Sequence, residues 1–326
     1  MIQEIYKNIY LNTIRLPHTP LKALNSYIIT DDNHALIIDS GFNAKESYDD
    51  FFDGITSLGI DIKNTDLFLT HLHADHSGLA FEFQKQSSGK VYASSLDSQF
   101  ISSMVDDSFS DLFRKSLVLF GINESDDFFK NHPAIVYCPK GNIDFTILKH
   151  KDRLTVGSYK LDIISVPGHT PDHISLYDTT NKIYFFFFFI ISSISPNISF
   201  WGDEYKDMLG QYIHSLDNIY NLDINYVFSS HRDIITDHKK RINEIKLHHK
   251  ERLDEILNIL KLSDSKLSVL EIAAKMHWDY RAENFNAFPN AQKWFACSEA
   301  MAHLEHLRFT SKVKLSEIDN GRFYFL

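Results

Sequence analysis

The chain has 326 residues, of which 44% are hydrophobic and 23% charged, and its formal net charge is −10. These values are typical of a globular protein that holds one core domain and a smaller second one. The negative balance argues against a surface wholly devoted to nucleic-acid binding.

Cysteine usage and the first residues both predict a cytoplasmic protein. Cys138 and Cys297 lie far apart and match no metal or redox spacing, which is usual in a reducing cytosol. Residues 1–7 lack the basic and then apolar regions of a secretory signal. We therefore expect a protein that is neither exported nor inserted in a membrane.

Up to about residue 80 the chain alternates short β-prone runs with turn residues. Within this part, Tyr48, Phe51, Phe52 and Ile55 recur at helical spacing and predict a crossover helix over 42–58. A second helix is expected over 79–86, and a short strand over 91–93.

The stretch Thr-His-Leu-His-Ala-Asp-His-Ser-Gly at 70–78 carries the strongest chemical signal. It places His71, His73, Asp75 and His76 on one loop, directly after an apolar run that reads as a strand. Histidine accounts for only 17 of the 326 residues, so three within six positions are not expected by chance. Imidazole and carboxylate together suit zinc, and also iron or manganese. The loop therefore predicts a metal site.

Aromatic and apolar residues at helical spacing then predict a helical insertion over about 95–130. The residues concerned are Met104, Leu112, Phe113, Leu117, Phe120, Phe128 and Phe129. Two interpretations stay open, because such a segment can simply pack over the core or can line the substrate site.

Strands are expected again at 145–148, 159–164 and 175–177. The apolar run at 183–191 is nine residues long, about half of what a membrane-spanning helix requires. Because it is rich in aromatic and β-branched residues, a buried strand is the better interpretation.

After residue 236 the pattern becomes mostly helical, and we expect a second domain over 237–326. Helices are predicted at 237–261, at 268–276 with a Ser268–Glu271 capping box, and at 291–308. Asp-Asn-Gly at 319–321 predicts a closing hairpin. Over 239–326 Lys and Arg only slightly outnumber Asp and Glu, so a structural or dimerising tail is favoured over a nucleic-acid reader.

These motifs together resemble the metallo-β-lactamase superfamily. The loop at 70–78 is similar to its His-x-His-x-Asp-His signature, and Pro-Gly-His-Thr at 167–170 and Ser-Ser-His at 229–231 follow in the family order. The segments 24–29 and 36–41 resemble its opening strands. The resemblance implies an α+β fold, a four-layer αββα sandwich over 1–236, and the tail resembles the winged-helix domain of some members.

The resemblance also implies two divalent metal ions, zinc first and iron or manganese as alternatives. The first ion would be held by His71, His73 and His169, and the second by Asp75, His76 and His231. Asp75 would in addition orient the nucleophile, a hydroxide generated at the metal pair. Asp39 would orient a ligand histidine, and His173 would be structural or support a ligand.

One position departs from the family pattern. Most of its hydrolases have Gly-Asp at the end of the strand after the Gly-His-Thr element, and this Asp bridges the two metals. Alignment through the flanking residues places Phe187 and Phe188 there, and phenylalanine offers no lone pair. Asp203 follows about 15 residues later and reads better as part of a loop near the substrate entrance. The second ion would then be held more weakly.

Three accounts of this gap remain open. In the first, the enzyme works without a bridging carboxylate, as true β-lactamases of the superfamily do. In the second, the second metal is weak or absent and the role is binding or regulation. In the third, the phenylalanine run is a sequence anomaly or an engineered change that removed a native Asp. A metal-dependent hydrolase is preferred because the six other ligand positions are intact.

The expected substrate is a small intracellular acyl compound, such as a thioester of glutathione or coenzyme A. The alternative is a catalytically impaired or non-enzymatic protein that binds a partner, with a homodimer left open. Flavodiiron, RNA-processing and exported lactamase branches are disfavoured, because their extra domain, basic surface or signal peptide is not found.

Overall fold

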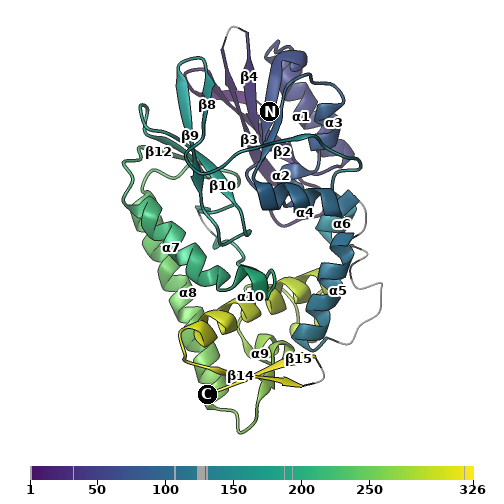
Figure 1. Ribbon diagram of the computed structural model, residues 1–326, viewed down its shortest axis with the longest axis vertical. Coiled ribbons are helices and arrows are strands. Elements are labelled where there is room, and N and C mark those ends of the chain that lie inside the picture. The colour runs from purple at the N-terminus through teal and green to yellow at the C-terminus, as the bar shows by residue number, and fades with distance from the viewer. Residues whose placement is uncertain are drawn as a thin grey trace.

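The computed structural model describes residues 2–31, 33–105, 108–122, 129, 131–186, 188–192, 194–318 and 320–326. One end of the molecule is a sandwich of two β-sheets, and the other is a mainly helical region built by the last part of the chain (Figure 1). Within the described residues, no helix is both long and apolar enough to cross a membrane.

The first sheet has seven strands that follow one another in chain order. They are β1 (Ile2–Tyr6), β2 (Ile9–Arg15), β3 (Ala23–Thr30), β4 (Ala35–Ile38), β5 (Thr65–Phe68), β6 (Val91–Ala93) and β7 (Phe145–Ile147). Strands β1 to β4 pair antiparallel, whereas β4 to β7 pair parallel. Parallel neighbours need crossover connections, and α1 (Lys45–Ser57) and α3 (Ala80–Gln84) lie within two of them, as predicted.

The second sheet has the strand order β12-β11-β10-β9-β8. Its members are β8 (Arg153–Val156), β9 (Tyr159–Ser165), β10 (Ile174–Asp178), β11 (Ile183–Phe186) and β12 (Tyr226–Ser229). Tyr27 and Phe68 of the first sheet share a buried core with Phe185 and Phe228 of the second. On the opposite face of the second sheet, Tyr184 of β11 belongs to a second buried core, to which helix α7 (Met208–Tyr220) also contributes. The layers are therefore those of the predicted αββα sandwich.

The phenylalanine run is a strand only in its first half, so the prediction of a strand through residue 191 is wrong. Strand β11 ends at Phe186, Phe187 lies outside the described residues, and Phe188 has a left-handed backbone with φ of 52°. The N–H of Phe188 donates to Ser230 Oγ at 2.9 Å instead of a strand neighbour. The next residue, Phe189, is still buried. Its carbonyl accepts a hydrogen bond from the Tyr212 hydroxyl at 2.6 Å.

The insertion is helical where the structure describes it, as α4 (Ser95–Val105) and α5 (Ser108–Phe120). Residues 123–128, which include Phe128, lie outside the described part. Helix α5 extends away from the sandwich and packs against the C-terminal region (Figure 1).

The C-terminal region contains α8 (His238–Lys261), β13 (Leu267–Ser268), α9 (Val269–Lys275), α10 (Asn290–Phe309), β14 (Lys314–Ile318) and β15 (Gly321–Phe325). The three strands form a sheet in the order β13-β15-β14. The predicted helices and hairpin are confirmed, and so is the capping box of Ser268 and Glu271. The winged-helix assignment and the boundary after residue 236 stay predictions. Helix α10 packs against both α5 and α7, so one continuous core joins this region to the sandwich.

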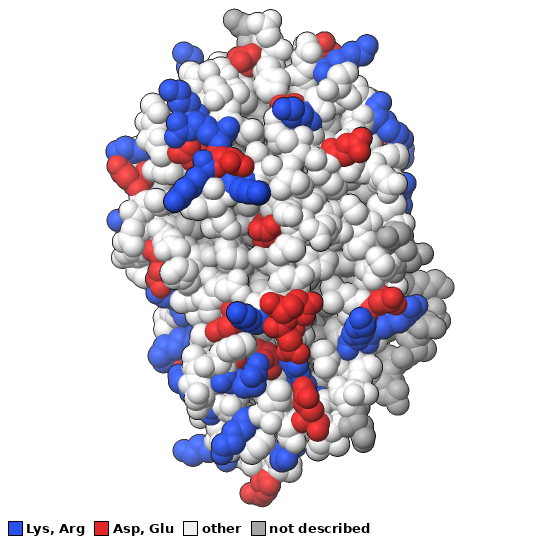
Figure 2. All heavy atoms as spheres, in the orientation of Figure 1, with Lys and Arg blue, Asp and Glu red and all other residues white. Residues whose placement is uncertain are grey.

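Charge is unevenly distributed over the face shown in Figure 2. A belt across its middle, between the sandwich and the C-terminal region, is almost free of Lys and Arg, which gather above and below it. Uncharged side chains occupy most of the belt, with a small acidic spot near its centre.

The capping box gives a test of the C-terminal helices. We expect Ser268→Ala to lower the free energy of unfolding by about 1 kcal/mol, because the N–H of Glu271 loses its acceptor, the Ser268 hydroxyl. Urea denaturation followed by circular dichroism measures the change. Glu271→Gln is the matched control, since glutamine still accepts from the Ser268 N–H. Equal midpoints for Ser268→Ala and wild type would contradict the assignment.

Candidate metal centre

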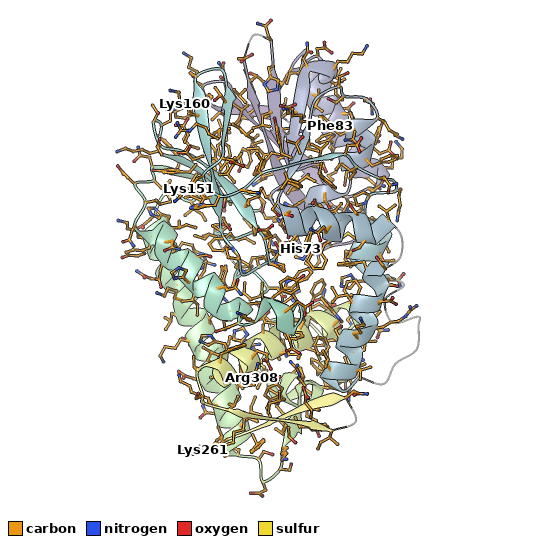
Figure 3. All side chains as sticks on the ribbon, viewed as in Figure 1. His73, Phe83, Lys151, Lys160, Lys261 and Arg308 are labelled. Carbon is orange, nitrogen blue, oxygen red and sulfur yellow. The ribbon has the colours of Figure 1, made fainter. Side chains whose placement is uncertain are left out.

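The candidate ligands come from three loops at one edge of the sandwich. His71 and His73 follow β5, and the short helix α2 (Ala74–Ser77) carries Asp75 and His76. His169 lies in the turn between β9 and β10, and His231 follows β12. Figure 3 shows His73 near the middle of the molecule, between the sandwich and the C-terminal helices. The structure thus brings together all six residues named from the sequence, in the same two groups.

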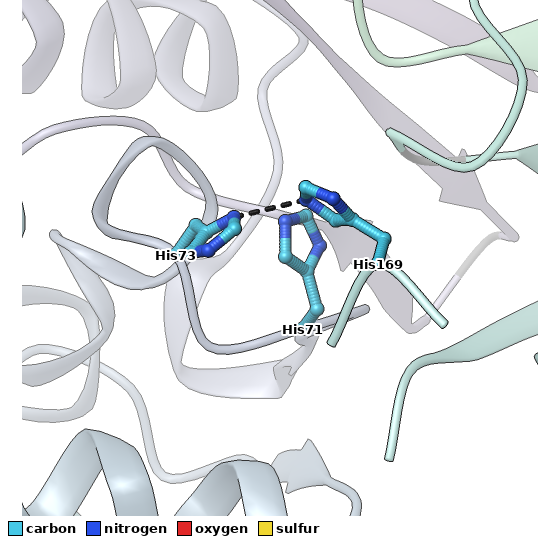
Figure 4. Close-up of side chains that lie close together, drawn as sticks. All are labelled: His71, His73 and His169. Carbon is cyan, nitrogen blue, oxygen red and sulfur yellow. Dashed lines mark hydrogen bonds between the residues drawn. The ribbon is translucent and has the colours of Figure 1, made fainter. Parts of the chain in front are cut away.

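The first group consists of His71, His73 and His169, whose candidate donor atoms lie within 4.8 Å of one another. Their rings converge on one point (Figure 4), and His73 Nδ1 lies 3.0 Å from His169 Nε2. His169 Nδ1 lies 2.7 Å from the backbone carbonyl of Asn197. Because a carbonyl only accepts, Nδ1 carries the proton and Nε2 keeps a lone pair for a metal.

The second group consists of Asp75, His76 and His231, again within 4.8 Å. Asp75 Oδ2 lies 3.3 Å from Nε2 of both histidines. His231 Nδ1 donates to the carbonyl of Ala23 at 2.7 Å, which leaves its Nε2 as the free donor atom. Asp39 Oδ2 lies 2.6 Å from His76 Nδ1, so the prediction that Asp39 orients a histidine of this loop is confirmed.

Burial keeps the first group neutral. It lowers the pKa of His73 to about 4 and holds the pKa values of His71 and His169 well below their usual range. Neutral imidazole is the form that coordinates a metal.

The second group behaves differently, because it contains a carboxylate. Burial opposes ionisation of Asp75, but His76 and His231 beside it hold the pKa of this carboxyl well below its usual range. Burial likewise opposes a charged His76, yet the carboxylates of Asp75 and Asp39 raise its pKa to about 9. Asp75 and His76 therefore form a buried pair of opposite charges.

Both groups fit a divalent cation. In the described part of the chain, His71 Nε2, His231 Nε2 and Asp75 Oδ2 are buried and make no hydrogen bond. An unsatisfied buried polar atom costs about 1–3 kcal/mol, and a bound ion would remove that cost. Three histidines in one group, and two histidines with a carboxylate in the other, are donor sets typical of zinc and related metals.

The ring of Phe188 lies between the two groups. It stacks on His169 with the ring centroids 4.6 Å apart, and its centroid is 5.2 Å from that of His231. This side chain adds no donor atom to either group. Asp203 is instead paired with Arg322, 2.5 Å from its Nη2, and lines the rim of the cavity described below.

Asp97 is a supporting residue that the sequence reasoning missed. Its Oδ2 accepts from the N–H of Leu72 at 3.1 Å and from the Thr170 hydroxyl at 2.9 Å, so it ties the loop of His71 and His73 to the loop of His169. Burial raises the pKa of Asp97 to about 8. Its place just after β6, next to β5 in the sheet, is the signal that points to it.

The C-terminal region holds the segment that orients His169. The Asn197 side chain donates to Glu299 Oε2 at 2.7 Å, on α10. Nearby, the N–H of Phe200 donates to the Ser298 carbonyl at 3.2 Å. Burial raises the pKa of Glu299 to about 7. No sequence motif marks this contact, because 102 positions separate Asn197 and Glu299.

Both groups border a cavity of about 1080 Å³. His73 and His169 of the first group and Asp75 of the second form part of its lining. Its walls are contributed by α5, by the segment 194–204 and by the start of α10. Of the two interpretations left open for the insertion, α5 therefore satisfies both: it packs on α10 and it lines the cavity.

Comparisons with known proteins agree with this architecture. The family model of the metallo-beta-lactamase superfamily matches residues 20–231. A metallo-beta-lactamase family protein from Thermus thermophilus superimposes with a TM-score of 0.81 at 22% identity, covering 99% of both chains. A beta-lactamase domain protein from Burkholderia ambifaria gives 0.80 at 20% identity, covering 100% of this chain and 94% of that one. At this identity the two structures show a shared fold, which includes the C-terminal region.

One curated relative is similar in sequence. The chain is 25% identical to hydroxyacylglutathione hydrolase GloC of Haemophilus influenzae over 199 residues, which are 61% of this chain and 81% of that protein.

The anchoring of His169 by α10 can be tested through metal binding. We expect Glu299→Ala to weaken metal affinity about tenfold, because the Asn197 carbonyl loses its support and His169 Nε2 is less well aimed. Competition with a chromophoric chelator measures the affinity. Glu251→Ala, at an exposed position on α8, is the control and should bind as wild type. Equal affinity in both variants would show that His169 does not depend on α10.

Proposed function

This chain belongs to the metallo-beta-lactamase superfamily, and we propose that it is a metal-dependent hydrolase of a small acyl substrate, with a thioester as the preferred class. The main support is that two adjacent groups, each of three candidate metal ligands, border one large cavity. We propose zinc as the metal at both groups, since histidine and carboxylate donors suit it.

When bound, a metal pair supplies a hydroxide near neutral pH and polarises the substrate carbonyl. The chain's own residues prepare that chemistry. Asp39 and the carbonyls of Ala23 and Asn197 accept from Nδ1 of His76, His231 and His169, so Nε2 is the atom that each of these three rings turns toward a metal.

Asp75 is the residue we assign to orienting the nucleophile. Its carboxylate is ionised at neutral pH and lies at the cavity floor. An ionised carboxylate can accept a proton from an attacking water.

The choice of a thioester is supported by the sequence similarity to the Haemophilus influenzae hydroxyacylglutathione hydrolase, of which this chain spans 81%. A hydroxyacylglutathione is a glutathione thioester, and this chain is proposed to act on the same bond type.

A second candidate function is favoured by one observation, the ring of Phe188. It lies between the two ligand groups and stacks on His169, where it blocks the approach of a bridging carboxylate or water. In this alternative the protein binds one ion firmly, does not turn over substrate, and acts as a binding or regulatory protein.

Metal removal separates the two candidates. For the hydrolase we expect close to two equivalents of zinc per chain after saturation, and S-lactoylglutathione hydrolysis that falls at least about a hundredfold after chelation and returns with zinc. Elemental analysis and a thiol-release assay measure both. One equivalent or none, with no hydrolysis after reconstitution, contradicts the hydrolase and supports the binding protein.

The effect of Phe188 is tested by Phe188→Asp. The left-handed backbone at this position, with φ of 52°, suits aspartate better than phenylalanine. The new carboxylate would face both groups, so we expect affinity for the second ion to rise about tenfold or more, measured by chelator competition, with an increase in kcat.

Phe188→Leu is the matched control, because it removes the ring without adding a donor atom. If the Asp and Leu variants bind zinc equally, a missing carboxylate is not what limits the second group.

A further inference from the structure

The walls of the cavity are aromatic on three sides. Phe109 and Phe113 of α5 line it on one side, Phe200 and Trp201 of the segment 194–204 on another, and Trp294 at the start of α10 on a third. These rings support one another: the Phe113 and Trp294 centroids are 4.9 Å apart in an edge-to-face arrangement. The shape is therefore set by packed rings rather than by flexible side chains.

Positive charge is scarce in this cavity. Among the described lining residues, Lys115 is the only Lys or Arg, and it is exposed; the acidic residues Asp111 and Glu204 line the same cavity. Burial lowers the pKa of His132 to about 3, so this wall histidine is neutral. The belt in Figure 2 that is almost free of Lys and Arg agrees with this balance. Phosphate groups are usually bound by Arg and Lys, and the cavity offers no such cluster.

The apolar wall is continuous with the metal centre. The Trp201 ring stacks near His73 with centroids 5.9 Å apart, and its Nε1 donates to the His169 carbonyl at 3.1 Å. On the other side of His169, Phe188 forms part of the same lining. A substrate carbonyl at the metal centre would therefore have its substituent among aromatic side chains.

We propose that the substrate is a thioester with an uncharged, mainly apolar acyl group of medium length or an aromatic acyl group, and that a polyanionic carrier such as coenzyme A is selected against. This inference rests on the proposed function for the position of the scissile bond. Leu112, Phe113 and Trp294 are the residues we assign to acyl-group recognition, since they line the cavity and belong to neither group of ligands.

Binding can be tested without turnover, using thioethers that cannot be hydrolysed. Two of the three tryptophans, Trp201 and Trp294, line the cavity, so their fluorescence reports its occupation. We expect S-decylglutathione to bind the zinc-loaded protein about a hundredfold more tightly than S-methylglutathione, because each buried methylene adds favourable transfer free energy. Equal affinities would overturn the inference.

A pair of variants on α5 locates the site. Leu112→Asp places a charge in the cavity wall, and we expect it to weaken S-decylglutathione binding about tenfold or more while S-methylglutathione is unaffected. Val118→Asp is the matched control, because Val118 is 49% exposed on the same helix and does not line the cavity. An equal loss of S-decylglutathione affinity in both variants overturns the assignment. Should Leu112→Asp fail to fold, the affinities of the wild-type protein for S-decylglutathione and S-methylglutathione still test the inference.

Turnover separates this inference from the proposed function. We expect S-decanoyl-N-acetylcysteamine to be hydrolysed with a higher kcat/KM than both its acetyl counterpart and decanoyl-coenzyme A, by about tenfold or more. Hydrolysis without acyl-length dependence, or with preference for the coenzyme A ester, overturns the inference and leaves the hydrolase standing. Tight S-decylglutathione binding without any hydrolysis supports the apolar site and overturns the hydrolase.

Discussion

The metal centre depends on two buried aspartate side chains, Asp39 and Asp97, that hold one loop from both sides. The loop follows β5, the strand between β4 and β6. Asp39, directly after β4, accepts from the N–H of Thr70 at 2.9 Å, and Asp97, shortly after β6, accepts from the N–H of Leu72 at 3.1 Å. Because parallel strands end at the same edge, each neighbour can supply an acceptor to the loop between them. The buried N–H groups are satisfied, and the ligand side chains are left to face a metal.

The C-terminal region completes this arrangement rather than standing apart from it. Helix α10 holds Asn197 through Glu299, and Asn197 in turn orients His169. The start of the same helix forms a wall of the cavity. A ligand and the substrate wall therefore rest on a region whose sequence shows no metal motif. The solved structures from Thermus thermophilus and Burkholderia ambifaria match over nearly the whole chain, so this combination of sandwich and helical region is a shared architecture.

Phe188 has a side chain that suits neither its own backbone conformation nor the histidines around it. A bulky side chain has a left-handed backbone there, and an apolar ring lies among histidines that otherwise prepare a site for ions. Sites that break a local rule are commonly functional or strained. The same ring extends the aromatic lining of the cavity to the ligands, so it bears on both the strength of the second metal group and the kind of acyl group that fits.

The family, the crossover helix of the first half, the C-terminal helices and the two groups of candidate ligands could all be predicted from the sequence, because the histidine spacing at 70–78 and the short motifs around 169 and 231 are local signals. The capping box of Ser268 and the final hairpin are local too. Three features could not be predicted from the sequence: where β11 ends, the support of the ligands by Asp97, Asn197 and Glu299, and the aromatic cavity between α5 and α10. These features depend on contacts between residues far apart in the chain, and no local pattern encodes such a contact.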